Sequence, residues 1–358
     1  EKGVQSAEAV LEEVSISSVI QDSEGNFWVA TYGQGLYFLP ANSEKIEVLN
    51  EDNGLGNAAL ESVLATNDKI WIGNARGELR YIQGDRIRRI DMADGLSDRL
   101  NRIIGIDELS TGQLILATDK GTFLWDGDGF FQILDEPTKA LYLHAEEELI
   151  LSTSFGVVEI PLKCLLDNAK PGVSLRDICG QYYTRLRKNR SYAVFKDESG
   201  QYWCDDVRNG LVTVKDSEAF FWSEIGPAFR SNISEILQLD NGIIALATQG
   251  EGVILVRGQE YLQINTEQGL SGDICNDMIT DGENLWVATN RGVTSIKQIS
   301  FENKSYQLDI YNHLDGLITN EIKALARLDG VLFLASPGGL IRFREKELSE
   351  NSILPRID

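Results

Sequence analysis

Side chains that could perform catalysis are few in this sequence of 358 residues. It contains two histidines, His144 and His313, which fall in different contexts, and four cysteines without a CxxC pair. General acid–base and nucleophilic catalysis need a base close to its partner, and zinc sites need closely spaced Cys and His ligands. Gly-x-Ser-x-Gly elbows and phosphate-binding Gly-Lys-Ser/Thr loops do not occur. The sequence therefore predicts no catalytic residue, no metal site and no cofactor.

Carboxylates are abundant but are not spaced for catalysis. Glycoside hydrolysis needs two carboxyl groups about 5–10 Å apart across the bound sugar. Asp205 and Asp206 are neighbours in an expected strand and would point to opposite faces. Residues 125–130 (Trp-Asp-Gly-Asp-Gly-Phe) resemble part of a calcium loop but lack its later Glu, so they indicate a tight hairpin turn instead.

The charge balance excludes other classes. The 33 Lys and Arg residues face 55 Asp and Glu residues, which gives a formal net charge of −22. Such a chain would repel nucleic-acid phosphates and anionic lipid. Its longest apolar runs have the length of a strand, well below the ~20 residues that cross a bilayer. We expect no nucleic-acid partner and no direct membrane insertion by this segment.

A repeat organises nearly the whole chain. Its clearest copies, residues 22–36 and 281–293, contain an acidic turn, Trp-Val-Ala-Thr, and then a glycine turn. Eight copies share this frame at spacings of 35–53 residues. Their central positions are Trp28, Trp71, Ile115, Ile150, Trp203, Ala245, Trp286 and Phe333.

Each copy predicts short strands with period-two alternation between clusters of Gly, Asp and Asn. Four strands in about 40–45 residues are typical of a β-propeller blade. We therefore predict an all-β fold, a β-propeller of four-stranded antiparallel blades. The eight copies favour eight blades.

The Asp-x-x-Gly-x-x-Trp-x-x-Thr motif with its following Gly-Leu, and the Asp-Gly-Leu linkers at 94–96 and 315–317, resemble the two-component regulator propeller repeat. This repeat is found in extracytoplasmic sensor regions of bacterial one-component and hybrid histidine-kinase systems, especially in Bacteroidetes. The resemblance covers residues 15 to about 345, although some copies lack the aromatic residue and the copy at Trp203 has Asp206 in place of Thr. Propellers of this family are usually seven-bladed, so seven blades are the alternative. The markers of WD40 and kelch repeats are absent from the sequence.

The pattern also predicts boundaries. Residues 1–14 are expected to be a leader or a strand from a preceding segment, and residues 15–348 the propeller. Residues 349–358 would start a following domain, which the resemblance implies is a β-sandwich. Residues 163–190 are expected to add an insertion to the outer strands of a blade. A disulfide between Cys164 and Cys179 is possible there; otherwise both read as small buried side chains.

Turn composition points to a candidate site. In a propeller the first-to-second turns lie on one face, and here they are acidic, whereas the second-to-third turns at the opposite channel mouth present cations and aromatic rings. Guanidinium groups and aromatic faces suit carboxylate-bearing or neutral sugars. The alternative is that these are ordinary exposed turn residues. The candidate ligand-binding residues are Tyr32, Arg76, Lys120, Phe155, Arg208, Glu251 and Arg291.

The resemblance implies a periplasmic ligand-sensing module, part of a membrane-anchored receptor and itself non-catalytic. It further implies recognition of oligosaccharides from glycan breakdown. The expected partners are a small saccharide, the remainder of the receptor chain and a second copy in a homodimer. Two alternatives stay open: a protein-interaction scaffold that does not sense, and a propeller lyase or hydrolase, which the scarcity of bases disfavours. A sensor would be stabilised by its saccharide and a scaffold would not.

Overall fold

The computed structural model describes residues 14–56, 59–66, 68–91, 101–170, 173–282 and 284–348. In these ranges the chain forms antiparallel strands and a few short helices, which confirms the all-β prediction. None of the helices in these ranges is long and apolar enough to cross a membrane. Residues 1–13 of the expected leader, the linker at 94–96 and the tail at 349–358 lie outside the described residues.

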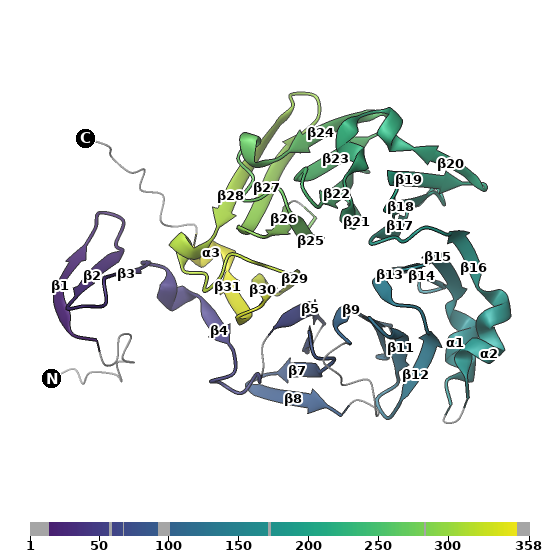
Figure 1. Cartoon of the computed structure of the whole chain (residues 1–358), viewed down its shortest axis with the longest axis horizontal. Coiled ribbons are helices and arrows are strands. Elements are labelled where there is room, and N and C mark those ends of the chain that lie inside the picture. Colours follow the sequence, from purple (N-terminus) through teal and green to yellow (C-terminus); the bar gives the residue numbers. More distant parts are fainter. Residues whose placement is uncertain are drawn as a thin grey trace.

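Seven four-stranded sheets surround a common axis and form the ring seen in Figure 1. Their innermost strands contact one another in chain order, from β5 through β9, β13, β17, β21 and β25 to β29, and β29 contacts β5. The ring is therefore a closed β-propeller. We number its sheets as blades I to VII.

Blade I contains β5 (Leu60–Ala65), β6 (Ile70–Asn74), β7 (Leu79–Gln83) and β8 (Arg86–Ile90). Blade II contains β9 (Ile103–Glu108), β10 (Leu114–Thr118), β11 (Gly121–Trp125) and β12 (Phe130–Leu134). Blade III contains β13 (Thr138–His144), β14 (Glu148–Thr153), β15 (Gly156–Pro161) and β16 (Thr184–Arg187). Blade IV contains β17 (Val194–Lys196), β18 (Tyr202–Asp206), β19 (Gly210–Lys215) and β20 (Glu218–Phe221).

Blade V contains β21 (Ile233–Gln238), β22 (Ile244–Thr248), β23 (Val253–Arg257) and β24 (Glu260–Ile264). Blade VI contains β25 (Cys275–Thr280), β26 (Leu285–Thr289), β27 (Gly292–Ser300) and β28 (Ser305–Tyr311). Blade VII contains β29 (Ala324–Leu328), β30 (Val331–Ser336), β31 (Gly339–Arg344) and, as its outermost strand, β4 (Glu47–Leu49).

Blade VII closes the ring with strands from both parts of the chain. Its outermost strand β4 precedes blade I in the sequence but pairs with β31, so that Val48 lies opposite Ile341. Arg342 adds hydrogen bonds of 2.7 and 2.8 Å from its guanidinium to the Glu47 carboxylate. A ring of separate sheets is thereby tied between its first and last blades by main-chain hydrogen bonds.

The first copy of the repeat forms a sheet outside the ring. Strands β1 (Ile16–Gln21), β2 (Phe27–Thr31) and β3 (Leu36–Leu39) form three strands of a blade, at the left of Figure 1. All eight copies therefore fold as antiparallel sheets, but the ring has seven blades, which is the alternative rather than the favoured count. The reason is the pairing of β4 with β31: the strand that would complete the first sheet completes blade VII instead.

In three of the four copies that contain it, the repeated Trp forms a local hydrogen bond with an acidic residue; the exception is Trp71, whose buried Nε1 has no partner among the described residues. The indole Nε1 donates to a carboxylate of the preceding first-to-second turn, at 2.9 Å from Trp203 to Asp197 and at 3.4 Å from Trp286 to Asp281. Because its polar atom is satisfied within its own hairpin, the indole can be buried between blades. Trp286 is accordingly fully buried.

A small residue two positions after the Trp permits close packing of the next blade. In blade I this residue is Gly73, and a Cβ there would approach the Ile103 side chain of blade II to 2.6 Å. Trp71 fills the adjoining space with Ile106 and Phe123 of blade II. The aromatic residue and the small residue thus act together in one interface between blades.

The insertion predicted at residues 163–190 is confirmed in blade III. It contains α1 (Leu162–Asn168), α2 (Leu175–Cys179) and a short turn that leads into the outer strand β16. Cys164 and Cys179 form a disulfide, with their Cα atoms 5.9 Å apart. The other two cysteines, Cys204 and Cys275, are free and buried.

Candidate ligand-binding face

The up-and-down order of strands places the second-to-third turns and the blade connections at one end of the ring. We call this end the mouth face. Arg76, Lys120, Phe155, Arg208, Glu251 and Arg291 all lie in second-to-third turns of blades I to VI, as expected. Tyr32 does not belong to this group. It is 74% exposed in the turn between β2 and β3, outside the ring, because the first repeat copy is not a blade of the ring.

The Thr of the repeat shapes the turn that carries each of these residues. In blade VI, Thr289 Oγ1 accepts the backbone N–H of Arg291 at 3.0 Å and donates to the carbonyl of Gly292 at 2.9 Å. Gly292 has φ of 124°, and a side chain at this position would collide with the carbonyl oxygen of Tyr311. One hydroxyl and one glycine therefore hold Arg291 at the tip of the turn.

Copies that lack the Thr use another acceptor for the same N–H. Asn74 Oδ1 accepts from the backbone N–H of Arg76 at 2.9 Å in blade I. Asp206 Oδ1 accepts from the N–H of Arg208 at 3.0 Å in blade IV. The departures from the motif thus preserve the turn.

Three arginines of the mouth face are available for a ligand. Arg76, Arg208 and Arg291 are exposed, and their guanidinium groups make no hydrogen bond or ion pair with any residue that the structure describes. Phe155, in the corresponding turn of blade III, is 58% exposed. The Glu251 carboxylate already has a partner in the protein, because it accepts a hydrogen bond from Gln263 Nε2 at 2.9 Å.

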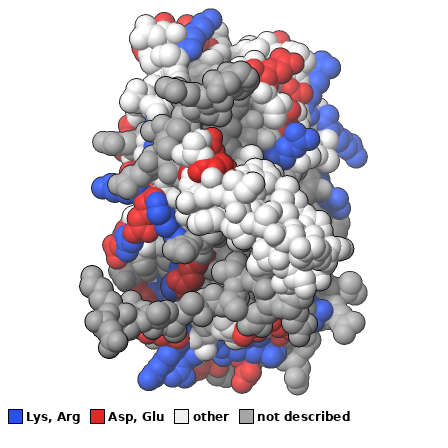
Figure 2. All heavy atoms as spheres, turned by 90° about the vertical axis from the view of Figure 1, so that its left-hand side faces the viewer, with Lys and Arg blue, Asp and Glu red and all other residues white. Residues whose placement is uncertain are grey.

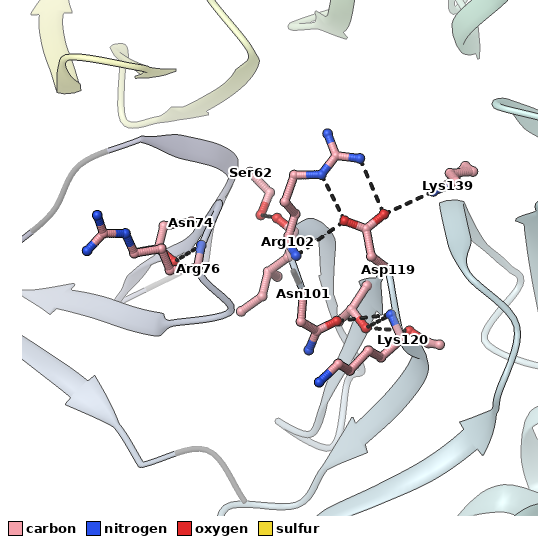
Figure 3. Close-up of polar contacts among 11 residues, drawn as sticks. Ser62, Asn74, Arg76, Asn101, Arg102, Asp119, Lys120 and Lys139 are labelled. Carbon is pink, nitrogen blue, oxygen red and sulfur yellow. Dashed lines mark hydrogen bonds and ion pairs between the residues drawn. The ribbon is translucent and has the colours of Figure 1, made fainter. Parts of the chain in front are cut away.

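A second group of charges lies at the inner ends of the blades and is directed toward the axis. Arg102, which precedes β9, pairs with Asp119 at 2.8 Å, and Lys139 of β13 approaches the other oxygen of Asp119 to 3.0 Å. Figure 3 shows these three side chains converging, whereas the side chains of Arg76 and Lys120 point away from them. The turn cations of blades I and II therefore do not line the axis.

Burial and pairing shift the pKa values in this inner group. Burial alone would raise the pKa of Asp119, but the hydrogen bonds from Arg102 and Lys139 hold it below its usual value. Burial raises the pKa of Glu61 of β5, although the positive charges of Arg102 and Lys323 oppose the rise. Charges of opposite sign from blades I, II, III and VII thus interact at the inner ends of the blades.

Sequence reasoning missed this inner group because it considered only the turns. Glu61 and Lys139 occupy the second position of an innermost strand, and Arg102 and Lys323 directly precede one. Alignment of the repeat copies at the start of their first strands would have shown charged residues at these positions. That signal is weaker than the Trp and Thr motif because it has no fixed residue type.

The two neighbouring carboxylates of blade IV have separate structural partners. Asp205 accepts backbone N–H groups of Tyr192 and Ile233 at 3.1 Å each, and Ile233 belongs to blade V. Asp206 pairs with Arg187 at 2.9 Å. Burial raises the pKa of Asp205 to about 7, whereas that of Asp206 lies below its usual value: burial opposes this, but the bonds from Arg187 and Asn189 outweigh it. Their partners lie in different elements, so the two do not form a catalytic pair.

The two histidines also lie far from each other, on different faces of the ring. His313 lies in an exposed connection, with its Nδ1 2.9 Å from the side-chain nitrogen of Asn320. His144 ends β13 on the other face of the ring, beside Tyr142. The described residues contain no group of three or more His, Cys, Asp or Glu side chains that could hold a metal ion.

Comparison with known proteins agrees with the repeat. Residues 11–33 match the family model described as two component regulator propeller. The match covers the first of the eight repeat copies, so this copy is similar to the two component regulator propeller repeat. In the structure the copies form antiparallel sheets, several with the Thr turn, and three of the four copies that contain the Trp form the Trp-to-acid hydrogen bond.

The two-component system proteins that the chain resembles are longer than the chain. A curated relative, Histidine kinase P4 of Formosa agariphila, is 22% identical over 187 residues, which are 48% of this chain and 13% of the relative. The extracellular domain of the hybrid two component system BT3049 from B. thetaiotaomicron is 20% identical, with a TM-score of 0.68 over 96% of this chain and 47% of that domain. Virginiamycin B lyase from Staphylococcus aureus shares the fold at 10% identity, with a TM-score of 0.62 over 84% of this chain and 98% of the lyase. The chain thus spans less than half the length of its two regulator relatives.

Proposed function

We propose that the chain is the ligand-sensing propeller of an extracytoplasmic bacterial receptor and that it recognises oligosaccharides. The observation that carries the proposal is the mouth face, where Arg76, Arg208 and Arg291 extend unpaired guanidinium groups from turns held by the repeat. Guanidinium groups bind carboxylates in a bidentate manner, so acidic sugars are the favoured ligands. The module itself would be non-catalytic and would act through the rest of its receptor chain, as a homodimer in the intact receptor.

The setting is supported by two independent observations. The similar domain of BT3049 is an extracellular domain of a two component system, and the similar protein from Formosa agariphila is a histidine kinase. The Cys164–Cys179 disulfide fits an oxidising compartment such as the periplasm. A lyase function finds less support, because the two histidines, His144 and His313, lie on different faces of the ring.

A protein-interaction scaffold is the second candidate, favoured by apolar side chains on the same face. Leu314 and Ile318, in the connection between blades VI and VII, are 57% and 50% exposed, and Ile274 before β25 is 39% exposed. Exposed apolar residues that cluster on one face favour a protein partner over a sugar. The ligand experiment separates the two candidates.

The experiment measures thermal stability with acidic and neutral tetrasaccharides at two salt concentrations. A sensor at a hundredfold excess over the dissociation constant should gain about 2.7 kcal/mol. We expect the triple variant Arg76→Ala, Arg208→Ala, Arg291→Ala to lose the shift caused by tetragalacturonate. The control Arg86→Ala, Arg88→Ala, Lys304→Ala, which removes the same charge from exposed positions outside the mouth face, should keep it. Absence of any shift in the unmodified chain would favour the scaffold.

The sheet β1–β3 leads to a further proposal on domain organisation. No other described sheet packs against it: Trp28 is 39% exposed and Ile20 opposite it is 65% exposed. Figure 2, which faces this side of the molecule, shows a broad uncharged surface. Its edge strand β3 lacks the fourth strand that every blade of the ring has. We propose that this sheet packs within another part of the receptor, in the same way that blades pack in the ring.

A further inference from the structure

A hollow of about 540 Å³ lies between blades IV and V on the face opposite the mouth. The first-to-second turn of blade IV and the third-to-fourth turn of blade V form its rim. Its volume falls within the range of small-molecule sites. We call it the IV/V hollow and define it by Gln201, Phe220, Trp222, Gln238 and Gln259.

Aromatic rings form one wall of the IV/V hollow. Phe220 of β20 is 43% exposed, and its ring meets Trp222 edge to face at 5.7 Å. Trp222 in turn lies 5.4 Å from Trp203. Both indole N–H groups have partners in the protein, Thr213 Oγ1 at 3.3 Å for Trp222 and Asp197 Oδ2 at 2.9 Å for Trp203. The wall therefore offers a rigid apolar surface rather than hydrogen-bond donors.

Amide side chains form the other part of the lining. Gln201 comes from blade IV, and Gln238 and Gln259 from blade V. None of the three side-chain amides makes a hydrogen bond to another residue in the described part of the chain. Each amide can donate two hydrogen bonds and accept at a carbonyl oxygen, which matches vicinal hydroxyl groups.

The charges around the IV/V hollow disfavour an anionic ligand. Its lining contains Asp197 and Glu198 but no Lys or Arg. The Asp197 carboxylate is already occupied by Trp203 Nε1 and by the hydroxyl of Ser199, at 2.7 Å. Apart from the Glu198 carboxylate, the groups left for a ligand are therefore neutral amides and aromatic surface.

Three other hollows in the described part of the ring do not combine aromatic surface with several unpaired amides. The hollow at Tyr261 and Phe301 has Gln259 alone, among charged side chains. The hollow between β14, β15 and α1 contains Tyr182 but is lined by several carboxylates, including Glu146 and Glu159. The hollow between blades V and VI, near Asp240 and Lys297, has no aromatic lining. Aromatic surface together with several unpaired amides occurs in the IV/V hollow alone among these four.

We infer that the IV/V hollow binds a neutral saccharide, with the apolar face of a sugar ring on Phe220 and its hydroxyls on Gln201, Gln238 and Gln259. Aromatic rings offer a flat apolar surface for the C–H face of a pyranose, and uncharged amides satisfy hydroxyls without the desolvation cost of a charge. The inference takes its ligand class from the proposed sensing function but concerns a different site. It separates a neutral subsite on this face from the acidic-sugar site proposed at the mouth face.

The test measures binding of neutral tetrasaccharides (cellotetraose, xylotetraose, mannotetraose and maltotetraose) to the full chain by titration calorimetry and tryptophan fluorescence. One of them should bind and change the emission of Trp222. Phe220→Ala and the double variant Gln238→Ala, Gln259→Ala should each raise the dissociation constant at least tenfold. Tyr182→Ala, which removes an exposed ring from a different hollow, should leave it unchanged.

The outcomes separate this inference from the proposed function. Binding of a neutral sugar that Phe220→Ala abolishes supports the inference. Binding of any saccharide that is insensitive to Phe220→Ala, or that depends only on Arg76, Arg208 and Arg291, overturns the inference and leaves sensing intact. A failure of every neutral and acidic saccharide to bind overturns both. Circular dichroism of each variant verifies that the loss is not caused by unfolding.

Discussion

Trp28 and Trp286 occupy the same position of the repeat, yet Trp28 is 39% exposed whereas Trp286 is fully buried. Each donates its indole N–H to an acidic residue of the preceding turn, Asp22 at 2.9 Å and Asp281 at 3.4 Å. The local structure of the two copies is therefore the same. Only the neighbouring blades distinguish them: Trp286 packs with Tyr311 and blade VII, whereas no sheet in the described ranges adjoins Trp28.

This difference predicts unequal effects of the same substitution. Trp286→Ala should lower the free energy of unfolding by about 3–5 kcal/mol, since it removes a large buried ring and leaves a cavity. Trp28→Ala should lower it by about 1 kcal/mol or less, because its ring is already in contact with water. Urea unfolding followed by circular dichroism measures both. Equal losses would show that the sheet β1–β3 is packed against the ring in solution.

The disulfide of blade III predicts a redox effect confined to its insertion. Cys164 and Cys179 are 15 residues apart, and closing such a loop stabilises a fold by about 3 kcal/mol in the chain-entropy account. The double variant Cys164→Ser, Cys179→Ser should lose about 3 kcal/mol of unfolding free energy and be cut faster by trypsin at Arg176, as followed by mass spectrometry. Dithiothreitol should lower the unfolding free energy and speed the tryptic cleavage of the unmodified chain but change neither in the variant, because Cys204 and Cys275 are already free thiols.

Asp206 replaces the usual Thr of the repeat, and its ion pair explains why Thr would fail there. Its side chain is 2% exposed and pairs at 2.9 Å with Arg187, which is 20% exposed. Asp206→Thr would keep an acceptor for the turn but leave the guanidinium unpaired, so we expect a loss of about 3–5 kcal/mol. Adding Arg187→Leu should restore most of it.

Acid provides the check on this ion pair. The pKa of Asp206 is lowered in the folded chain: burial opposes the shift, but the hydrogen bonds from Arg187 and Asn189 prevail. Its contribution is therefore fully present above the unfolded pKa of about 4 and is lost as the pH falls through the folded pKa. The stability difference between the Asp206→Thr variant and the unmodified chain should shrink below pH 4. A difference that is constant down to pH 3 would exclude the ion pair as its cause.

The repeat allowed much of the fold to be predicted from the sequence, because Trp, Thr and Gly form contacts within about ten residues of one another. The hydrogen bonds of Thr289 to Arg291 and Gly292 are of this kind. The number of blades depends instead on the pairing of β4 with β31, in which Val48 lies opposite Ile341. These two strands are far apart in the sequence, and no local motif marks their pairing. Because this pairing leaves no signal in the sequence, the eight copies predicted eight blades instead of the seven in the ring.

The candidate site was predictable to a smaller extent for the same reason. Turn residues such as Arg76 could be assigned to the mouth face from strand order alone. The direction of a side chain depends on its neighbours, and Arg76 points away from the group formed by Arg102 and Asp119. The aromatic IV/V hollow was not predicted at all, since Phe220 and Trp222 lie outside the repeated motif and meet Gln238 only when two blades pack.

Because of their raised pKa values, the buried carboxyl groups of the ring should lower its free energy of unfolding as the pH rises from about 4 to 7. Burial raises the pKa of Asp205 to about 7, and that of Asp107 and Asp277 to about 6. Between the unfolded pKa near 4 and these values the folded chain binds more protons than the unfolded chain. Each such proton makes stability fall by about 1.4 kcal/mol per pH unit as the pH rises.

Asp205→Asn isolates one of these groups. Asparagine is uncharged at every pH and keeps a carbonyl oxygen for one of the two N–H groups of Tyr192 and Ile233. The variant should match the unmodified chain at pH 4 and below, where Asp205 is protonated in the fold and largely so in the unfolded chain, and exceed its stability at pH 8. Urea midpoints at half-unit steps from pH 4 to pH 8 measure the slope. A variant that is less stable than the unmodified chain at pH 8 would mean that the two backbone hydrogen bonds outweigh burial and keep Asp205 ionised.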